Sequence, residues 1–435
     1  MTLMKLSAQD YGFSTIAGLA GIFGGSADGT NSDARFDSPV AVAVDGGGNI
    51  YVADYFNDTI RKVTPVGTNW VVKTIAGLAG AAGIADGTNS NARFNQPSGV
   101  AVDSQDNLYV ADYFNHIIRK VTPTGTNWVV KTIAGLAGTN GIADGTNSEA
   151  RFYYPRSVAV DAEGNLFVAD LDNSTIRKIT PVGTNWVVTT IAGLAGTNGI
   201  ADGTNSNARF YWPAGIAVGT NGNVFVSDYN NNTIRKLEPG GTNWVVTTIA
   251  GLAGFNGSSN GTNSNARFFS PASLAVDAGG NVYVADSRND SLRKLTPAGT
   301  NWVVTTIGGQ AGNPGSTNGT NTVALFNQPQ GIAVDSVGNV YVADAENNTV
   351  RKGNILVSAT SPPPVFQTIA QSNGIVVFTW SAVSGRSYQA QYKTNLIQSN
   401  WVDFGGIRVA TDITITSSDS IGTDRQRFYR IVLLP

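Results

Sequence analysis

One phrase recurs along this chain at an unvarying interval. A short apolar segment ending in Val-Ala-Asp or Val-Ser-Asp occurs six times, and each copy follows the previous one by 58 residues. Six copies of one length, without an insertion or deletion, must each fit the same geometric slot, as a closed ring demands and an open solenoid does not. The aspartates that end the phrase are Asp54, Asp112, Asp170, Asp228, Asp286 and Asp344.

Each repeat is predicted to contain four antiparallel strands. In the second copy, residues 99–103 and 108–112 are short apolar strands joined by a polar turn, and residues 117–121 follow a second turn. A Thr-Pro-Thr-Gly-Thr-Asn break separates these from a fourth strand at residues 128–133. No segment has the spacing of an amphipathic helix. We therefore predict an all-β chain built on a six-bladed β-propeller, with four antiparallel strands in each blade.

The two ends of the repeat predict how the ring closes. Residues 11–16 align with residues 70–75, the fourth strand of the first copy, although they precede the first complete hairpin. The last copy stops after its third strand, near Ile355. We predict that residues 11–18 supply the outer strand of the last blade, so that the N-terminal chain closes the ring.

These motifs resemble a known family. The run Pro-x-Gly-Val-Ala-Val-Asp, then Gly-Asn-Leu-Tyr-Val-Ala-Asp, then Asn-x-x-Ile-Arg-Lys-Val resembles the NHL repeat, and residues 141–152 resemble the long inter-blade loop of secreted bacterial NHL proteins. The resemblance covers residues 11 to about 355 and implies an NHL-type six-bladed β-propeller. It says little about function, because one fold hosts many functions.

The C-terminal part has a different pattern. Strand-like alternation at residues 375–380, 387–392, 412–416 and 428–433 places Trp380, Tyr392 and Tyr429 as the core of a small β-sandwich would need. This segment resembles a fibronectin type III or immunoglobulin-like module, with a role as spacer, anchor or glycan contact. The predicted organisation is a propeller over 1–355, a stiff Pro-rich linker over 356–365 and the sandwich module over 366–435.

The composition excludes several classes of protein. Charged residues make up 13% of the chain and the net charge is −2, without a run of Lys or Arg, so the basic surface of a nucleic-acid binder is absent. There is no cysteine for a disulfide or a thiolate metal site, and no apolar run of membrane-spanning length. The first ten residues lack the apolar core of a signal peptide. We expect an extracellular or cell-surface monomer whose signal peptide has been removed.

Positions that are the same in all copies are expected to serve the blade. The repeated Asp, Asn57 with its equivalents, and the Arg-Lys pairs are interpreted as turn caps and their partners, within the blade or to the next one. The Asp-Gly-Thr-Asn-Ser stretches lack the residue order of a calcium loop, so we expect structural loops and no cofactor, with calcium as the alternative. The four stretches begin at Asp28, Asp86, Asp144 and Asp202.

The only histidine, His116, is expected to be a surface turn residue, because its equivalents are Asp, Ser or Asn. The amidating lyases that share the propeller fold hold their metal with several histidines, which this chain does not have.

Positions that differ between copies are free to serve a ligand. The loop before each first strand and the turn after each second strand should emerge on the same face, because strands alternate in direction. Aromatic residues gather there in neighbouring copies, together with charges that occur once, which suits sugars or peptides. The candidate ligand-binding residues are Tyr113, Phe114, Tyr153, Tyr154, Arg156, Tyr211, Trp212, Tyr229 and Arg288.

Three functions remain open from the sequence. The favoured one is a binding protein for a carbohydrate or a protein or peptide ligand. The second is a hydrolase or lyase, directed at a glycan or a lactone, at the channel mouth with Asp172 and Glu346 as the unrepeated carboxylates; their separation by three blades argues against it. The third is a purely structural surface repeat. We expect no metal site, since the positions after the repeated prolines lack the acidic ligands of the lactonases on related propellers.

Overall fold

The chain forms two compact units, Met1–Asn354 and Ile355–Pro435, which are described one at a time. The computed structural model describes residues 10–21, 23–356, 364–395, 400–422, 424 and 426–434. The predicted linker lies largely outside the described residues, as do the first nine residues considered above for a signal peptide. The first unit holds six five-stranded antiparallel sheets and the second holds two three-stranded sheets.

The six sheets of the first unit, here called blades 1 to 6, share one strand order from the inside of the ring outward. Blade 1 contains β3 (Pro39–Val44), β4 (Ile50–Asp54), β5 (Thr59–Val66), β6 (Asn69–Gly77) and β2 (Gly29–Thr30). Blade 2 contains β8 (Pro97–Val102), β9 (Leu108–Asp112), β10 (Ile117–Thr124), β11 (Asn127–Ala134) and β7 (Gly87–Thr88). Blade 3 contains β13 (Pro155–Val160), β14 (Leu166–Asp170), β15 (Thr175–Val182), β16 (Asn185–Ala192) and β12 (Gly145–Thr146).

The other three blades follow the same plan. Blade 4 contains β18 (Pro213–Val218), β19 (Val224–Asp228), β20 (Thr233–Gly240), β21 (Asn243–Gly251) and β17 (Gly203–Thr204). Blade 5 contains β23 (Pro271–Val276), β24 (Val282–Asp286), β25 (Ser291–Ala298), β26 (Asn301–Gly309) and β22 (Gly261–Thr262). Blade 6 contains β28 (Pro329–Val334), β29 (Val340–Asp344), β30 (Thr349–Ile355), β1 (Tyr11–Gly18) and β27 (Gly319–Thr320).

Short 3₁₀ turns of three residues are the only helical elements in the described residues. One set follows the two-residue strands: η1 (Asn31–Asp33), η3 (Asn89–Asn91), η5 (Asn147–Glu149), η6 (Asn205–Asn207), η7 (Asn263–Asn265) and η9 (Asn321–Val323). The other set follows the second strand of four blades: η2 (Tyr55–Asn57), η4 (Tyr113–Asn115), η8 (Ser287–Asn289) and η10 (Ala345–Asn347).

The fifth strand of each blade was not predicted. In blade 1 the pair Gly29 and Thr30 folds back onto the outer strand, opposite Val72 and Val71. Asn31 fixes this return, because its Oδ1 accepts a hydrogen bond of 2.7 Å from the backbone N–H of Trp70. The Asp-Gly-Thr-Asn-Ser stretch therefore covers the outer edge of the blade, which a free edge strand would expose.

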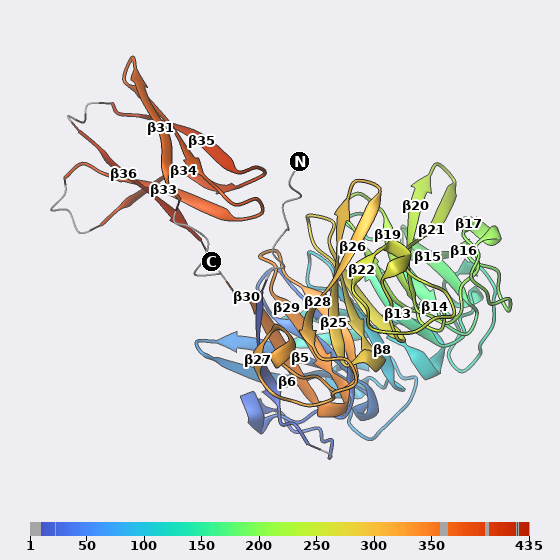
Figure 1. Ribbon diagram of the computed structural model, residues 1–435. Helices are drawn as coiled ribbons and strands as arrows, with labels where there is room; N and C mark the ends of the chain where they lie inside the picture. Colours follow the sequence, from blue (N-terminus) through green and yellow to red (C-terminus); the bar gives the residue numbers. More distant parts are fainter. Residues whose placement is uncertain are drawn as a thin grey trace. The chain divides into compact units, whose positions relative to one another are not determined.

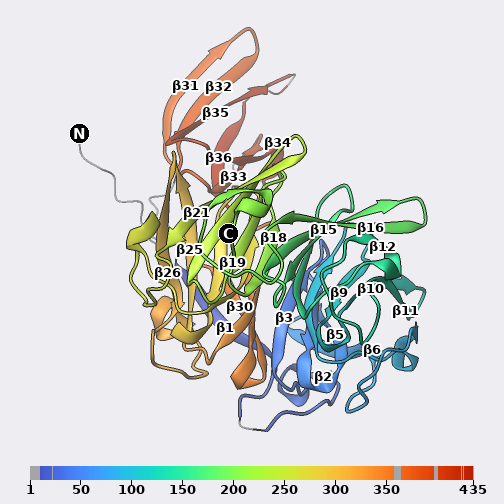
Figure 2. The same cartoon turned by 90° about the vertical axis from the view of Figure 1, so that its right-hand side faces the viewer.

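The ring is closed. The inner strands β3, β8, β13, β18, β23 and β28 contact one another in order, and β28 contacts β3 (Figures 1 and 2). Between blades, an aromatic residue of one second strand meets the tryptophan of the next outer strand edge-on, as Tyr51 and Trp128 do at 5.8 Å. The hydrophobic core is thus divided among the boundaries between blades.

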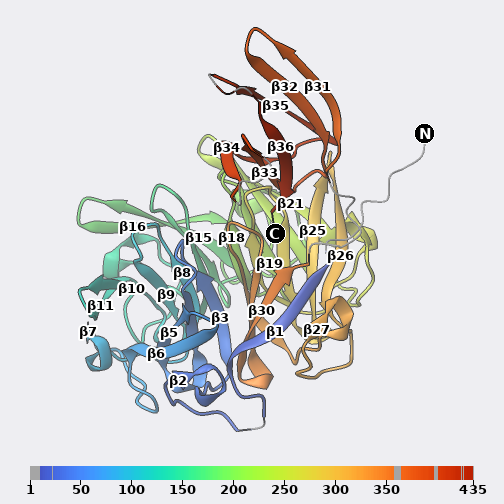
Figure 3. The ribbon, with the colours of Figure 1, turned by 90° about the vertical axis from the view of Figure 1, so that its left-hand side faces the viewer.

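The N-terminal strand closes the last blade, as the sequence predicts. Figure 3 shows β1 between β30 and β27, which lie far from it in the sequence. The backbone N–H of Tyr11 donates to Asn321 Oδ1 at 2.8 Å, which repeats the Trp70–Asn31 bond of blade 1. Phe13 fills the space beside Gly353, where an added Cβ would collide with its ring. Where the N-terminal strand meets the last blade, the large side chain of Phe13 therefore lies beside a residue without a side chain, Gly353.

The repeated aspartate and arginine form the scaffold of each blade. Asp54 Oδ1 accepts from the backbone N–H of Asp37, and its Oδ2 accepts from Asn57 Nδ2 at 2.8 Å and Arg61 Nη1 at 2.6 Å. Arg61 Nη2 donates to Asp28 Oδ1 at 2.9 Å. All these partners belong to the arginine's own blade, so the predicted alternative of bonds to the next blade is wrong. Burial raises the pKa of Asp54 to about 6, and the Arg61 guanidinium opposes this.

The second unit is a small β-sandwich with two strands more than the four that were predicted. One sheet holds β31 (Phe366–Ser372), β32 (Ile375–Ser381) and β35 (Thr414–Ser420); the other holds β34 (Val402–Val409), β33 (Ser387–Lys393) and β36 (Phe428–Leu433). Trp380 is fully buried, and the Tyr429 ring lies 5.2 Å from that of Phe378 in the same core. Tyr392 instead lies under the guanidinium of Arg427, at 4.1 Å.

Candidate functional site

Two connections of each blade meet on one side of the ring. In blade 1 the backbone N–H of Phe56, in the turn after the second strand, donates to Asp37 O at 3.1 Å, and that of Tyr55 donates to Ser38 O. The same bonds recur in other blades, for example from Asn230 to Tyr211. We call this side, formed by the two residues before each inner-strand proline and the turn after each second strand, the variable face.

A pocket of about 440 Å³ opens on the variable face at the ring axis. All six blades contribute to its wall, so it covers the mouth of the central channel. The lining residues are Ser38, Val40, Tyr55, Tyr113, Arg156, Leu171, Asp172, Trp212, Ala214, Tyr229, Ala272, Gln330, Ala345 and Glu346.

Four of the nine candidate ligand-binding residues line this pocket, namely Tyr113, Arg156, Trp212 and Tyr229. The other five do not. Tyr154 stacks on Tyr113 with ring centroids 4.7 Å apart, and both Phe114 and Tyr153 pack against Tyr154. These three support the wall from outside the pocket.

Two further candidates lie elsewhere on the variable face. Tyr211 meets the neighbouring Trp212 at 5.8 Å, and the Arg288 guanidinium lies 5.4 Å from the ring of Phe269. Neither lines the pocket at the channel mouth.

Tyr55 and Gln330 line the pocket and were missed. Tyr55 occupies the same repeat position as Tyr113, with ring centroids 6.3 Å apart, and Gln330 occupies the same position as Arg156. The signal that could have found them is their position in the repeat, which they share with the candidates Tyr113 and Arg156.

Arg156 is the only lysine or arginine in the pocket wall, and it reaches across the channel. Its Nη1 donates to Ser98 O at 3.2 Å, and its Nη2 donates to Gln330 Oε1 at 3.1 Å. Gln330 Nε2 in turn donates to Ser287 Oγ at 3.0 Å. Burial raises the pKa of Tyr113 to about 12 although the Arg156 charge lowers it, so the phenol remains protonated at neutral pH.

The two unrepeated carboxylates line the same pocket. Asp172 follows β14 in blade 3 and Glu346 follows β29 in blade 6. Their separation by three blades, used above against an enzyme, therefore does not keep them from one ligand. Burial raises the pKa of Asp172 above its ordinary value, while Glu346 is exposed.

The backbone beneath the pocket is left-handed at an unusual place for aromatic residues. Trp212 has φ 54° and Tyr154 has φ 53°, and the equivalent positions hold Ser or Gln in the same conformation. A bulky residue with positive φ is an outlier that costs on the order of 1–3 kcal/mol. The ring imposes this conformation on all blades, so aromatic residues here are explained by their contacts and not by backbone preference.

The sequence suggested that His116 lies at the surface. In the structure it is buried instead, at the contact between blades 2 and 3. Its Nδ1 accepts a hydrogen bond of 3.2 Å from the backbone N–H of Tyr154 in blade 3. Asp58 and Asn232 accept the equivalent bonds from Gln96 and Ser270. Burial lowers the pKa of the imidazole, which keeps the accepting nitrogen free of a proton.

The repeated loop aspartates are engaged within their blades. Asp144 Oδ1 accepts from Arg177 Nη2 at 2.7 Å and from Thr190 Oγ1 at 2.9 Å. Across the residues that the structure describes, no group of three or more His, Cys, Asp or Glu side chains is placed to hold a metal ion.

Comparison with known proteins agrees with this architecture. The NHL repeat matches residues 94–120 and 152–179, and the Teneurin NHL domain matches residues 186–360. The molecule is therefore a β-propeller that carries NHL repeats. NHL repeat-containing protein 2 of Bos taurus is 29% identical over 316 residues, covering 65% of this chain and 42% of that protein. The chain spans less than half the length of this protein and of two other curated relatives that it matches.

Two solved structures from Bacteroides species share the fold. A protein of unknown function from Bacteroides thetaiotaomicron has a TM-score of 0.59 and 23% identity, covering 79% of this chain and 76% of that one. An auxiliary nutrient binding protein from Bacteroides ovatus has a TM-score of 0.59 and 19% identity, covering 80% and 77%. In the described part of this chain, no helix is long and apolar enough to cross a membrane.

Proposed function

We propose that this propeller is a binding protein that takes a small carbohydrate into the pocket over its channel mouth. The observation that carries the proposal is that the positions repeated in every blade and the positions that differ between blades have different roles. The positions that are the same in every blade form the scaffold, whereas Arg156, Asp172 and Trp212, which differ between blades, meet in one pocket. The auxiliary nutrient binding proteins from Bacteroides that share the fold are consistent with a binding role.

The size and lining of the pocket favour a saccharide over a folded protein. At about 440 Å³ it lies within the range of small-molecule sites, roughly 300–1,000 Å³. Trp212 and Tyr229 offer aromatic surface, and the protonated phenol of Tyr113 donates and accepts hydrogen bonds. Arg156 and Gln330 add a guanidinium and an amide on opposite sides of the axis.

The test is a glycan array followed by titration calorimetry with the strongest saccharide. Trp212→Ala should abolish measurable binding, because it removes aromatic surface from the pocket wall. Tyr211→Ala is the matched control, since its side chain is adjacent and similarly exposed but lies outside the pocket. Equal loss in both variants, or no response on the array, would contradict the proposal, and a response to peptides alone would replace the saccharide with a peptide ligand.

A second candidate is a glycan- or lactone-directed hydrolase or lyase, which the shared pocket of Asp172 and Glu346 favours. Asp172, with its raised pKa, would act as the general acid and Glu346 as the base. Turnover of a bound glycan or lactone that disappears in both Asp172→Asn and Glu346→Gln, while binding persists, would establish this activity. Binding without turnover would leave the protein a receptor.

The cellular location, the oligomeric state and the role of the C-terminal unit are part of the same proposal. We place the protein outside the cell or on its surface, as a monomer of the secreted bacterial NHL type. The sandwich, with sheets β31-β32-β35 and β34-β33-β36, supports a fibronectin type III or immunoglobulin-like module that spaces or anchors the propeller. The proposed boundaries are propeller 1–355, linker 356–365 and module 366–435. Fractionation of the natural host and size-exclusion chromatography test location and monomeric state.

A further inference from the structure

Away from the variable face, the boundaries between blades repeat one arrangement of a lysine and an aromatic pair. In blade 1 the Lys62 ammonium lies 5.5 Å from the ring centroid of Tyr51 and 5.7 Å from that of Trp128 in blade 2. The equivalent lysines of four other blades also lie over the aromatic residue of their second strand, at 5.1–5.8 Å. They are Lys120 over Tyr109, Lys178 over Phe167, Lys294 over Tyr283 and Lys352 over Tyr341.

Blade 4 breaks this arrangement. Lys236 Nζ pairs instead with Glu238 Oε1 at 2.7 Å. In the described residues its ammonium makes no cation–π pair, although Phe225 is its cross-strand neighbour. Glu238 occurs once, because the same position is Thr in four blades and Asn in the sixth. The extra carboxylate therefore holds the lysine that elsewhere covers the aromatic residues.

The same blade also lacks a polar pair at this boundary. In blade 1 the Tyr51 hydroxyl donates to Asp45 Oδ2 at 3.1 Å. Blade 4 has Gly219 and Phe225 at these two positions, so the carboxylate and the hydroxyl are lost together and neither is left without a partner. Two independent departures from the repeat thus fall at one boundary.

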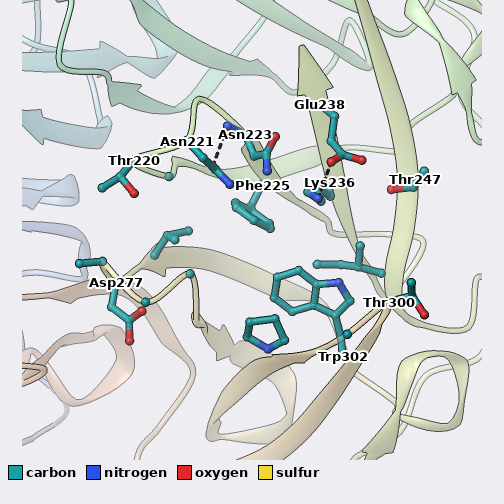
Figure 4. Close-up of a pocket in the computed structure, with 18 of the residues that line it drawn as sticks. Thr220, Asn221, Asn223, Phe225, Lys236, Glu238, Thr247, Asp277, Thr300 and Trp302 are labelled. Carbon is teal, nitrogen blue, oxygen red and sulfur yellow. Dashed lines mark hydrogen bonds and ion pairs between the residues drawn. The ribbon is translucent and has the colours of Figure 1, made fainter. Parts of the chain in front are cut away.

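A pocket of about 660 Å³ lies where these departures meet, between blades 4 and 5. Figure 4 shows Phe225 and Trp302 beside the cavity, with Lys236 joined to Glu238. The indole of Trp302 is partly exposed and meets Phe225 edge-on at 5.8 Å. Hydroxyls and amides of Thr220, Asn221 and Thr247 complete the wall.

The wall of this pocket holds one more carboxylate than lysine. The charged residues that line it are one lysine and two carboxylates, Lys236 with Glu238 and Asp277. The corresponding pocket between blades 1 and 2 is lined by two lysines and one carboxylate, Lys62 and Lys73 with Asp106. An aromatic surface without its own cation, in a net negative pocket, is suited to a cation from outside.

We propose that the pocket between blades 4 and 5 is a second binding site that takes an organic cation, an alkylated ammonium group, against Trp302. The ligand's ammonium replaces the lysine that covers the second-strand aromatic residue in five blades and also a tryptophan at two boundaries. The second carboxylate compensates the charge of the ligand. This site is separate from the proposed saccharide site at the channel mouth.

The experiment is titration of the full chain with Nε-trimethyl-lysine by calorimetry, with Trp302 followed by its indole N–H signal in NMR. Saturable binding at millimolar or lower concentration is expected, together with a shift of the Trp302 signal. Glu238→Thr restores the residue of four other blades and should weaken binding about tenfold or more, because Lys236 is then free to cover the ring. Trp302→Leu should have a similar effect.

Matched variants separate this site from the rest of the ring. Trp244→Leu alters the equivalent tryptophan, beside Phe167 and its lysine, and should leave affinity for the probe unchanged. Trp212→Ala should also leave it unchanged, even if saccharide binding is lost. The proposal is overturned by an absence of saturable binding, by unchanged affinity in Glu238→Thr, which alters only an exposed side chain, or by binding of neutral hexoses in place of the cation.

Discussion

The Arg156 guanidinium of blade 3 donates a hydrogen bond of 3.1 Å to the Gln330 side chain of blade 6, three blades away across the ring. A bond between such distant blades is possible only at the axis, where the inner strands converge. It places one positive charge over the channel mouth and fixes it with Ser98 O on one side and Gln330 on the other. A ligand at the mouth therefore meets a guanidinium that is already ordered.

Replacement of this charge should weaken the binding of ligand without unfolding the ring. Arg156→Ala introduces the residue that blades 4 and 5 have at the same position, so the strand itself is expected to tolerate it. Loss of a charged hydrogen-bond donor from the pocket should weaken saccharide binding by about 10- to 100-fold. Calorimetry measures the affinity and thermal unfolding checks the fold. Unchanged affinity in Arg156→Ala would mean that the ligand does not reach the axis.

The buried His116 predicts a pH dependence of stability. Burial lowers the pKa of the folded imidazole below its ordinary value of 6.5, so the unfolded chain takes up a proton first as the pH falls. The stability that His116 contributes is fully present above pH 6.5, the ordinary pKa of histidine in the unfolded chain. It is lost as the pH falls from there through the lower pKa of the folded state. His116→Asn keeps an acceptor for Tyr154 N–H, as Asn232 does for Ser270, but does not titrate.

The comparison of wild type and His116→Asn in urea at pH 7.5 and pH 5.5 isolates the histidine. The wild type should lose more stability on acidification than the variant does. The buried aspartates, with pKa values raised to about 6, act in the opposite direction, since their stabilisation increases as the pH falls, but they are common to both proteins. An equal loss in the two proteins would contradict the role given to the imidazole.

The two carboxylates bound by Arg177, the scaffold arginine of blade 3, are predicted to differ in importance. Asp144 has a half-exposed side chain, and blades 5 and 6 have Asn260 and Asn318 at its position with the same arginine bond. Asp144→Asn should therefore change the free energy of unfolding by less than about 1 kcal/mol.

Breaking the buried pair of Arg177 and Asp170 should lower the free energy of unfolding far more. Arg177→Met leaves the fully buried carboxylate of Asp170 without its cation and should cost on the order of 3–5 kcal/mol. Urea unfolding of the propeller, followed by tryptophan fluorescence, measures both variants. Similar losses for Asp144→Asn and Arg177→Met would show that the exposed aspartate has a role beyond the scaffold, such as binding an ion.

The propeller was predictable because the same strand and turn pattern occurs six times in the sequence. The interval of 58 residues determines the blades, and the alignment of residues 11–16 with the outer strands identifies the closing strand. In the sandwich, β31 was missed because most of its side chains are exposed and show no alternation. The other missed strand, β34, contains Gly405 and Gly406, next to which its pairing with β33 shifts register.

The site was only partly predictable, because a repeat position gives the face and the blade of a residue but not the direction of its side chain. Tyr154 and Trp212 occupy the same position with nearly the same φ. Tyr154 packs between Tyr113 and His116 and leaves the pocket, while Trp212 lines it. The difference arises from the preceding blade, because blade 2 supplies Tyr113 and His116 as packing partners for Tyr154. Contacts between two different blades cannot be predicted from the sequence of one repeat alone.

Ring closure offers a test in which two destabilising changes should compensate each other. Phe13 occupies the position of Val72, and Gly353 occupies that of Val63, so the contact of the N-terminal strand with the last blade has one large and one absent side chain where blade 1 has two valines. Gly353→Val would force a side chain into the Phe13 ring and should cost about 1–3 kcal/mol. Phe13→Val would leave a cavity beside Gly353 and should cost about 2 kcal/mol.

The double variant Phe13→Val/Gly353→Val recreates the valine pair of blade 1 and should be more stable than the sum of the single effects implies, with a coupling of about 1–3 kcal/mol. Urea unfolding of the four proteins gives this coupling. Phe13→Val/Ala101→Val serves as a control pair, because Phe13 packs against Phe326 and Gly353 whereas Ala101 lies in the core between blades 2 and 3. Additive effects at Phe13 and Gly353 would mean that the N-terminal strand does not pack against the last blade in solution, and that the ring closes without it.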